Sequence, residues 1–321
     1  MGYLRSQRVL FTAVALCALV TAAGCGEESP PRATPSAGDP PGFLLYLVEH
    51  EEPACPDPCD DEDPPAGAQT AWIETVRGDG TGLRRVSCVW ANPTRCDGEG
   101  HIGGHQPRIS PSGRFFATSD GPGTVSTDFA HVRVHDLDGR VVDRLRVPGN
   151  PKAVSWSPDE RYLAVTTDRP HGAPLYLVPR SGGRYRLLRR NGGWLTDWSR
   201  KGLLAGALQP LGVFRSDGRM LYRLTRVKSA FDWSPSGHLL AFGCRGQAIC
   251  AVRYDGRRRR VLTRRCSAGT YSPLAWSPDG RWIACTRSQE LVAVRLSDDA
   301  VRVIREQRPR DAIYDVDWGG G

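Results

Sequence analysis

The sequence predicts an all-β protein made of repeated units of four antiparallel strands, and three observations lead to this fold class. A short phrase related to Trp-Ser-Pro-Asp-Gly recurs along the chain at intervals of about 40 residues. A second turn signal, most often Asp-Gly, follows each phrase about 25 residues later. No stretch after Gly42 shows the long periodicity of an amphipathic helix, so a helical repeat is not expected.

The recurring phrase indicates a strand, a tight turn and a second strand. Ser-Pro-Asp-Gly suits a type I turn, because it offers a side-chain acceptor first, the fixed φ of proline second and glycine fourth. An apolar run that ends in alanine follows every copy, and in one degenerate copy Arg200 replaces the proline. The five copies are Ile109–Gly113, Trp156–Glu160, Trp198–Gly202, Trp233–Gly237 and Trp276–Gly280.

The second turn signal indicates a hairpin, because β-rich runs such as Leu175–Val178 flank it. Four short strands in each repeat make a propeller blade, so the expected architecture is a six-bladed β-propeller. The six hairpin signals are Asp79-Gly80, Asp138-Gly139, Gly182-Gly183, Asp217-Gly218, Asp255-Gly256 and Asp298-Asp299.

The first blade is divided between the two ends of the chain. It lacks its own Trp-Ser phrase and begins directly with an apolar strand, Phe43–Val48. The segment Ala312–Trp318 looks like the first half of a further phrase. We expect this C-terminal strand to complete blade 1 and close the ring, which also removes an exposed edge strand. The predicted propeller domain covers residues 43–321.

These phrases resemble the WD40-like (PD40) repeats of TolB-like propellers. The hallmark of those repeats is Trp-Ser-Pro-Asp-Gly followed by a basic residue and an apolar strand, and the resemblance covers residues from about 43 to 318. It implies a six-bladed ring of the TolB type.

The residues before the ring predict an address outside the cytoplasm. Residues 1–24 have the pattern of a signal peptide, in which Arg5 and Arg8 precede an apolar stretch that is too short to span a membrane. The small-small-Cys ending resembles the bacterial lipobox, which implies acylation of Cys25; a plainly secreted protein is the alternative. Residues 25–42, rich in Pro, Ser and Gly, are expected to be a flexible tether. The chain is therefore expected in the cell envelope, held to the membrane through the lipid anchor only.

Cysteine usage predicts disulfides formed in an oxidising compartment. Apart from Cys17 in the signal and Cys25 at the lipid site, the cysteines are Cys55, Cys59, Cys88, Cys96, Cys244, Cys250, Cys266 and Cys285. We expect Cys244 to pair with Cys250 and Cys266 with Cys285. The first four could pair locally or between two loops, and zinc binding at Cys55-x3-Cys59 is the alternative use. All eight map near one face of the ring, because loops between second and third strands emerge beside the connections between blades.

Two long loops on the same face are candidates for contact with a partner or a metal. The first, Glu49–Gln69, holds many carboxylates, and the second, Ser87–Gln106, adds two histidines four residues apart. These side chains could be solvated, contact a basic partner or bind calcium, although the spacing is not that of an EF-hand. No other cofactor is expected. The candidate residues are Asp60, Asp61, Asp63, Asp97, Glu99, His101 and His105.

The formal net charge of +8 does not predict nucleic-acid binding. Arginines are spread through every blade, and an envelope address removes the nucleic-acid partner. The run Arg257–Arg260 is expected to be a solvated strand edge protected by charge, with anionic lipid headgroups as the alternative contact.

No catalytic constellation is evident, since the chain lacks Gly-x-Ser-x-Gly, His-Glu-x-x-His and a phosphate-binding glycine loop. The predicted function is a monomeric, envelope-anchored scaffold that binds a protein or peptide through its disulfide-stapled loop face, without catalysis. The alternative is a metal-dependent propeller enzyme, with lactonase-like hydrolysis or lyase-like elimination at the channel mouth.

Overall fold

The computed structural model describes residues 38–51, 69–90, 107–120, 129–168, 172–193, 196–206, 210–225, 227, 230–244, 248–266, 274–288, 290–306, 308 and 311–320. Residues 35–321 form one compact unit. None of the described residues belongs to a helix long and apolar enough to span a membrane.

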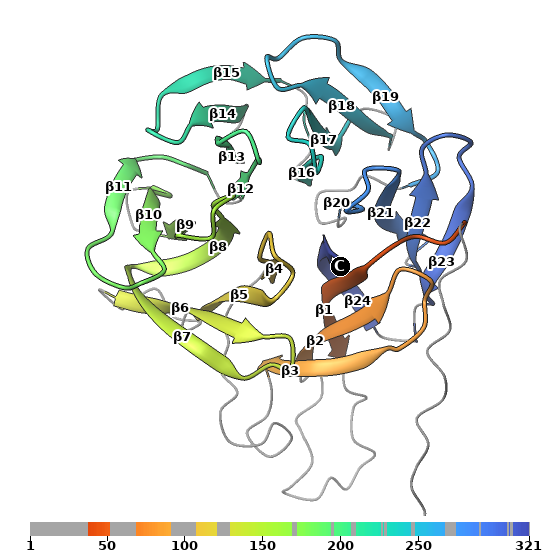
Figure 1. Ribbon diagram of the computed structural model, residues 1–321, viewed down its shortest axis with the longest axis horizontal. Helices are drawn as coiled ribbons and strands as arrows, with labels where there is room; N and C mark the ends of the chain where they lie inside the picture. The colour runs from red at the N-terminus through yellow and green to blue at the C-terminus, as the bar shows by residue number, and fades with distance from the viewer. Residues whose placement is uncertain are drawn as a thin grey trace, which may run out of the picture. The chain divides into compact units, whose positions relative to one another are not determined.

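Six four-stranded antiparallel sheets follow one another around a ring, which confirms the predicted six-bladed β-propeller (Figure 1). Blade 1 contains β24 (Asp311–Gly319), β1 (Phe43–Glu51), β2 (Gln69–Arg77) and β3 (Arg84–Trp90). Blade 2 contains β4 (Arg108–Ile109), β5 (Phe115–Asp120), β6 (Phe129–Asp136) and β7 (Val141–Pro148). Blade 3 contains β8 (Asn150–Trp156), β9 (Tyr162–Asp168), β10 (Leu175–Pro179) and β11 (Arg186–Arg189).

The remaining three blades repeat the same order from the axis outward. Blade 4 contains β12 (Thr196–Trp198), β13 (Leu203–Gly206), β14 (Leu211–Arg215) and β15 (Met220–Leu224). Blade 5 contains β16 (Phe231–Trp233), β17 (Leu239–Gly243), β18 (Ile249–Arg253) and β19 (Arg260–Thr263). Blade 6 contains β20 (Leu274–Trp276), β21 (Trp282–Arg287), β22 (Glu290–Arg295) and β23 (Val301–Arg305).

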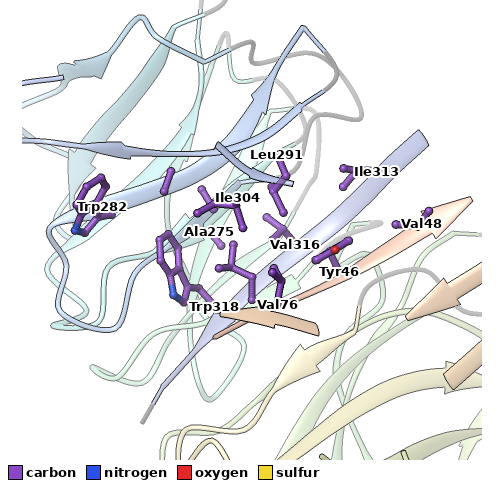
Figure 2. Packing of buried hydrophobic residues seen from close by; sticks show 13 residues of the cluster. Tyr46, Val48, Val76, Ala275, Trp282, Leu291, Ile304, Ile313, Val316 and Trp318 are labelled. Carbon is purple, nitrogen blue, oxygen red and sulfur yellow. The ribbon is translucent and has the colours of Figure 1, made fainter. Parts of the chain in front are cut away.

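The C-terminal strand closes the ring, as predicted. β24 pairs antiparallel with β1, so that Gly319 lies opposite Phe43 and Asp311 lies opposite His50. Val316 and Trp318 of β24 are buried in one cluster with residues of blade 6, including Ala275 (Figure 2). The first and last strands of the ring, β1 and β24, thus share a sheet and a hydrophobic core.

A buried serine holds the turn of each phrase. Ser157 Oγ accepts a hydrogen bond from the backbone N–H of Tyr162 at 2.9 Å, and Ser277 Oγ accepts one from Trp282 N–H at 2.9 Å. In the degenerate copy Ser199 Oγ accepts from Leu203 N–H at 3.0 Å. The turn therefore forms even where arginine replaces the proline.

The two faces of the ring differ, and we name them the turn face and the loop face. The turn face carries the phrase turns and the hairpin turns, because antiparallel order places the first and last connections of a blade at the same end. In blade 3, Arg180 N–H donates to the carbonyl of Arg161 at 2.9 Å, and in blade 5 Tyr254 N–H donates to that of His238 at 2.9 Å. The loop face carries the connections between second and third strands and between blades.

Candidate functional site

Most residues that the sequence singled out for a site lie outside the described residues. These are Cys25, Cys55, Cys59, Cys96, Asp60, Asp61, Asp63, Asp97, Glu99, His101 and His105. Cys88 is in β3, where its backbone lies opposite Trp72. The strands that flank the two long loops reach the loop face, since one loop joins β1 to β2 and the other joins blade 1 to blade 2.

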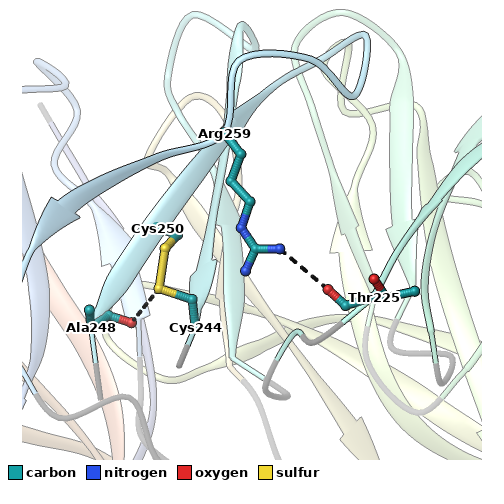
Figure 3. Close-up of a disulfide and its surroundings, with 5 residues drawn as sticks. All are labelled: Thr225, Cys244, Ala248, Cys250 and Arg259. Carbon is teal, nitrogen blue, oxygen red and sulfur yellow. Dashed lines mark hydrogen bonds between the residues drawn. A yellow bond between two sulfur atoms is a disulfide. The ribbon is translucent and has the colours of Figure 1, made fainter. Parts of the chain in front are cut away.

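Two disulfides lie toward the loop face of blades 5 and 6. Cys244 is bonded to Cys250 with the Cα atoms 5.8 Å apart (Figure 3). The backbone N–H of Cys244 also donates to the carbonyl of Ala248 at 2.9 Å. Cys266, after β19, is bonded to Cys285 in β21. The second bond joins neighbouring blades covalently. Because disulfides persist in oxidising compartments, the pair indicates an extracytoplasmic location.

Sequence reasoning missed a set of polar side chains on the innermost strands. In three blades an aspartate directly precedes the inner-strand tryptophan: Asp197 in β12, Asp232 in β16 and Asp317 in β24. The corresponding position of blade 2 is Arg108. A comparison across the repeats of the residue just before the inner-strand tryptophan, or before Ile109 in blade 2, would have found them. We call these four residues the axial set.

Each axial aspartate accepts a hydrogen bond from the next blade. Asp197 Oδ2 accepts from Trp233 N–H at 2.8 Å, and Asp232 Oδ2 accepts from Trp276 N–H at 2.6 Å. Asp317 Oδ2 accepts from the N–H of Ile109 at 2.6 Å. These bonds staple blade 4 to 5, 5 to 6 and 1 to 2.

Burial and mutual repulsion disfavour the charged forms of two of these carboxyls. Burial raises the pKa of Asp232 well above its ordinary value, and the carboxylates of Asp197 and Asp317 raise it further. Burial also raises the pKa of Asp317, although Arg108 offsets part of that shift. Burial opposes the charge of Arg108, but the carboxylates around it leave its pKa above the ordinary value. The axial set is thus one electrostatically connected group.

The geometry of the axial set explains ring assembly better than chemistry on a substrate. All three carboxylates accept backbone N–H groups, and within the described part of the chain no group of three or more His, Cys, Asp or Glu side chains is arranged to hold a metal ion. A convergent group of acids and histidines, which would have favoured metal chemistry, is therefore not formed by the described residues.

A second buried polar cluster lies where blade 6 meets blade 1. Arg305 Nη2 pairs with Asp311 Oδ2 at 2.7 Å, and its Nε pairs with Glu74 Oε2 at 3.1 Å. Tyr46 donates its hydroxyl to the same Glu74 oxygen at 3.1 Å. Burial, followed by the charge of Glu74, raises the pKa of Tyr46, so this hydroxyl remains a donor. The cluster ties β23, β24, β1 and β2 together and is structural.

Comparison with solved structures shows which known folds this one resembles. TolB from Acinetobacter baumannii superposes with a TM-score of 0.60 at 14% identity, over 88% of this chain and 68% of that protein. A chain of the nidogen/laminin complex superposes with a TM-score of 0.59 at 12% identity, over 86% of this chain and 98% of that one. A putative TolB from Agrobacterium tumefaciens superposes with a TM-score of 0.50 at 16% identity, over 85% of this chain and 98% of that one.

Similarity in sequence is more limited. No family model matches the chain. The uncharacterized protein YidR of Escherichia coli strain K12 is 27% identical over 73 residues, which are 23% of this chain and 18% of YidR. The six closed blades and the superposition on TolB structures together identify the chain as a TolB-like β-propeller in fold.

Proposed function

We propose that this chain is a cell-envelope lipoprotein, anchored through Cys25, whose propeller binds a protein or peptide partner on its loop face. The observation that carries the proposal is the placement of the Cys244–Cys250 and Cys266–Cys285 disulfides toward the same face as the ends of the long loops. Covalent bonds at that face hold its backbone in a fixed shape, which lowers the entropic cost of binding a partner.

The oxidising compartment that the disulfides indicate agrees with an envelope address. The axial carboxylates are engaged by backbone amides of the neighbouring blades, so nothing in their contacts favours a catalytic role. Proteins commonly bind their partners through loops that a rigid scaffold holds in place, and on the loop face the long loops connect strands of such a scaffold.

The partner site is tested by photo-crosslinking in intact cells. A photoreactive residue at exposed Asn191 or Arg264, both near the loop face, should give a protein adduct of defined mass. The matched control is the same probe at exposed Arg184 on the turn face, which should give no protein adduct. Protein adducts from position 184 alone would contradict the assignment of the binding face.

The anchor is tested separately. Mass spectrometry of the N-terminal peptide should find an acylated Cys25, and Cys25→Ala should release the protein from the membrane fraction. An unmodified Cys25 on a membrane-free protein would leave the secreted alternative.

A further inference from the structure

We propose that the turn face is the side of the ring that faces the membrane, and that its basic residues contact the headgroups of anionic phospholipids. This inference rests on the proposed anchorage for its orientation, while the headgroup contact can be tested without the anchor. Three features of the described residues lead to it.

The first feature is the place where the N-terminal segment joins the ring. The carbonyl of Gly42 accepts a hydrogen bond at 2.9 Å from Gly78 N–H, in the hairpin turn of blade 1. Gly42 also packs against Gly320, which in turn lies against Pro278 in the phrase turn of blade 6. Trp318 Nε1 donates to the carbonyl of Pro41 at 2.7 Å. The chain therefore joins the ring on the turn face.

This position limits how an anchored ring can be oriented. An anchor at Cys25 would reach the ring through Gly42, on the turn face, whereas the ends of the strands that flank the long loops lie on the opposite face.

The second feature is that the phrase turns contact one another around the axis. Gly280 lies against Pro235, and Gly237 lies against Lys201 and the backbone of Arg200. Ser112 N–H donates to the carboxylate of Glu160. Adjacent blades thus present their turns at one level, which suits contact with a planar surface.

The third feature is an excess of basic residues on the turn face of blades 3 to 5. The basic residues in these turns are Arg161, Arg180, Arg184, Arg200, Lys201, Arg215, Arg219, Arg253, Arg257 and Arg258, and the acidic ones are Asp159, Glu160, Asp217 and Asp255. Two of the acids are used within the turns, because Glu160 pairs with Arg180 and Asp255 pairs with Arg253.

Several of these cations remain available to an external anion. Arg184, Arg219 and Arg257 are exposed, and their guanidinium groups have no ion-pair partner among the described residues. By contrast, the turns of the other blades hold as many acidic as basic residues: Arg77, Arg84, Arg114, Arg140, Arg281 and Arg295 against Asp79, Asp136, Asp138, Asp279, Asp298 and Asp299. The net positive charge of this face is therefore concentrated in blades 3 to 5. Arginine suits phosphate groups because its planar guanidinium can donate two parallel hydrogen bonds.

The direct test measures binding of residues 35–321 to lipid vesicles. This piece keeps the complete ring, because all of β1 to β24 lie between Phe43 and Gly319 and the piece forms one compact unit. It should co-sediment with vesicles of phosphatidylcholine and phosphatidylglycerol but not with phosphatidylcholine alone, and added salt should weaken the binding. Absence of binding to the mixed vesicles at physiological salt would overturn the proposal.

Matched variants locate the contact. Arg219→Gln with Arg257→Gln removes two charges from the turn face and should lower the partition coefficient about fivefold for each charge. Arg264→Gln with Arg265→Gln removes two exposed charges that follow β19, near the loop face. This double variant should change the partition coefficient less than twofold. Melting curves check that both variants fold. Equal losses in the two variants would overturn the assignment to the turn face.

Hydrogen exchange gives an independent readout. Mixed vesicles should protect the backbone amides of the hairpin turns at 215–219 and 253–258, and should leave 263–266 unchanged. Protection at 263–266 alone would overturn the orientation. None of these outcomes depends on acylation of Cys25 or on a loop-face partner, so failure of this inference and failure of the proposed function can be distinguished.

Discussion

Single residues near the axis hold neighbouring blades together. Asp197, Asp232 and Asp317 each precede a tryptophan and accept a backbone N–H from the next blade. The same residues repel one another, because burial strengthens the interaction between their charges. A residue that staples two blades can thus also limit stability at neutral pH.

Replacing Asp232 by asparagine should show this opposition. The folded state binds the Asp232 proton more tightly than the unfolded chain, so stability falls as the pH rises from the ordinary aspartate pKa of 3.8 through the raised value. Asparagine keeps an acceptor oxygen without the charge. We expect Asp232→Asn to raise the free energy of unfolding at pH 7 by about 1 kcal/mol and to change it little below pH 4, as measured by urea titration.

The control variant is Asp232→Ala, which also removes the acceptor of the Trp276 N–H. It should lower stability by about 1–3 kcal/mol, since a buried N–H is left without a partner. A lower stability of the asparagine variant at pH 7 would contradict the repulsion argument.

At the level of elements, the blades differ in how strongly they are held. Blade 4 has short strands, with β12 of 3 residues and β13 of 4 residues, and its phrase turn lacks proline. Blades 5 and 6 contain the two disulfides found among the described residues. The order of local opening should follow these differences.

Hydrogen exchange should detect blade 4 opening first. The amides of β13 to β15, Leu203 to Leu224, should exchange before the corresponding strands of blades 3 and 5. Blade 4 has fewer paired residues than blade 3 and, unlike blade 5, contains no disulfide among the described residues. Exchange is measured by mass spectrometry of peptides under native conditions. Equal protection in the three blades would refute this order.

The two disulfides should contribute unequally to stability. Cys266 and Cys285 are separated by 19 residues, and Cys244 and Cys250 by 6. In the chain-entropy model the longer loop contributes about 3 kcal/mol and the shorter about 2 kcal/mol. Replacing each pair with alanine and titrating with urea measures both values. A larger loss from the Cys244–Cys250 pair would show that local packing dominates over loop entropy.

At the level of the whole molecule, the ring depends on the junction between blade 6 and blade 1. The C-terminal strand β24 supplies the inner strand of blade 1, and Arg305 pairs with Asp311 and Glu74 across the junction. The side chains of these three residues are at most 5% exposed. Removing the charge of Arg305 takes away the cation that bridges two buried carboxylates.

Arg305→Ala should therefore lower the free energy of unfolding by about 3–5 kcal/mol. The control is Arg302→Ala in the same strand, whose side chain is 47% exposed and whose loss should cost less than about 1 kcal/mol. Thermal and urea unfolding of both variants make the comparison. Similar losses in the two variants would mean that the buried cluster does not hold the junction.

Much of the fold could be predicted because local chemistry repeats. The Ser-Pro-Asp-Gly turns and the hairpin signals reveal the number of strands, and the partial phrase at Ala312–Trp318 reveals the closure. Even the degenerate copy at Arg200 was recognisable, since its serine and glycine keep their roles. Turn types depend on four neighbouring residues, which a single sequence contains in full.

The sequence by itself determined the repeat, the blade number, the closing strand and the favoured pairing of four cysteines. Only the tertiary structure decided which distant groups meet, because Asp317 and Ile109 are 208 residues apart and become neighbours only when the ring closes. Arg257 and Arg264 are both arginines that lie close to β19 in the sequence. The hairpin of blade 5 nevertheless places them toward opposite faces. Contacts around a ring depend on how all six blades pack, and that information is not contained in any one repeat.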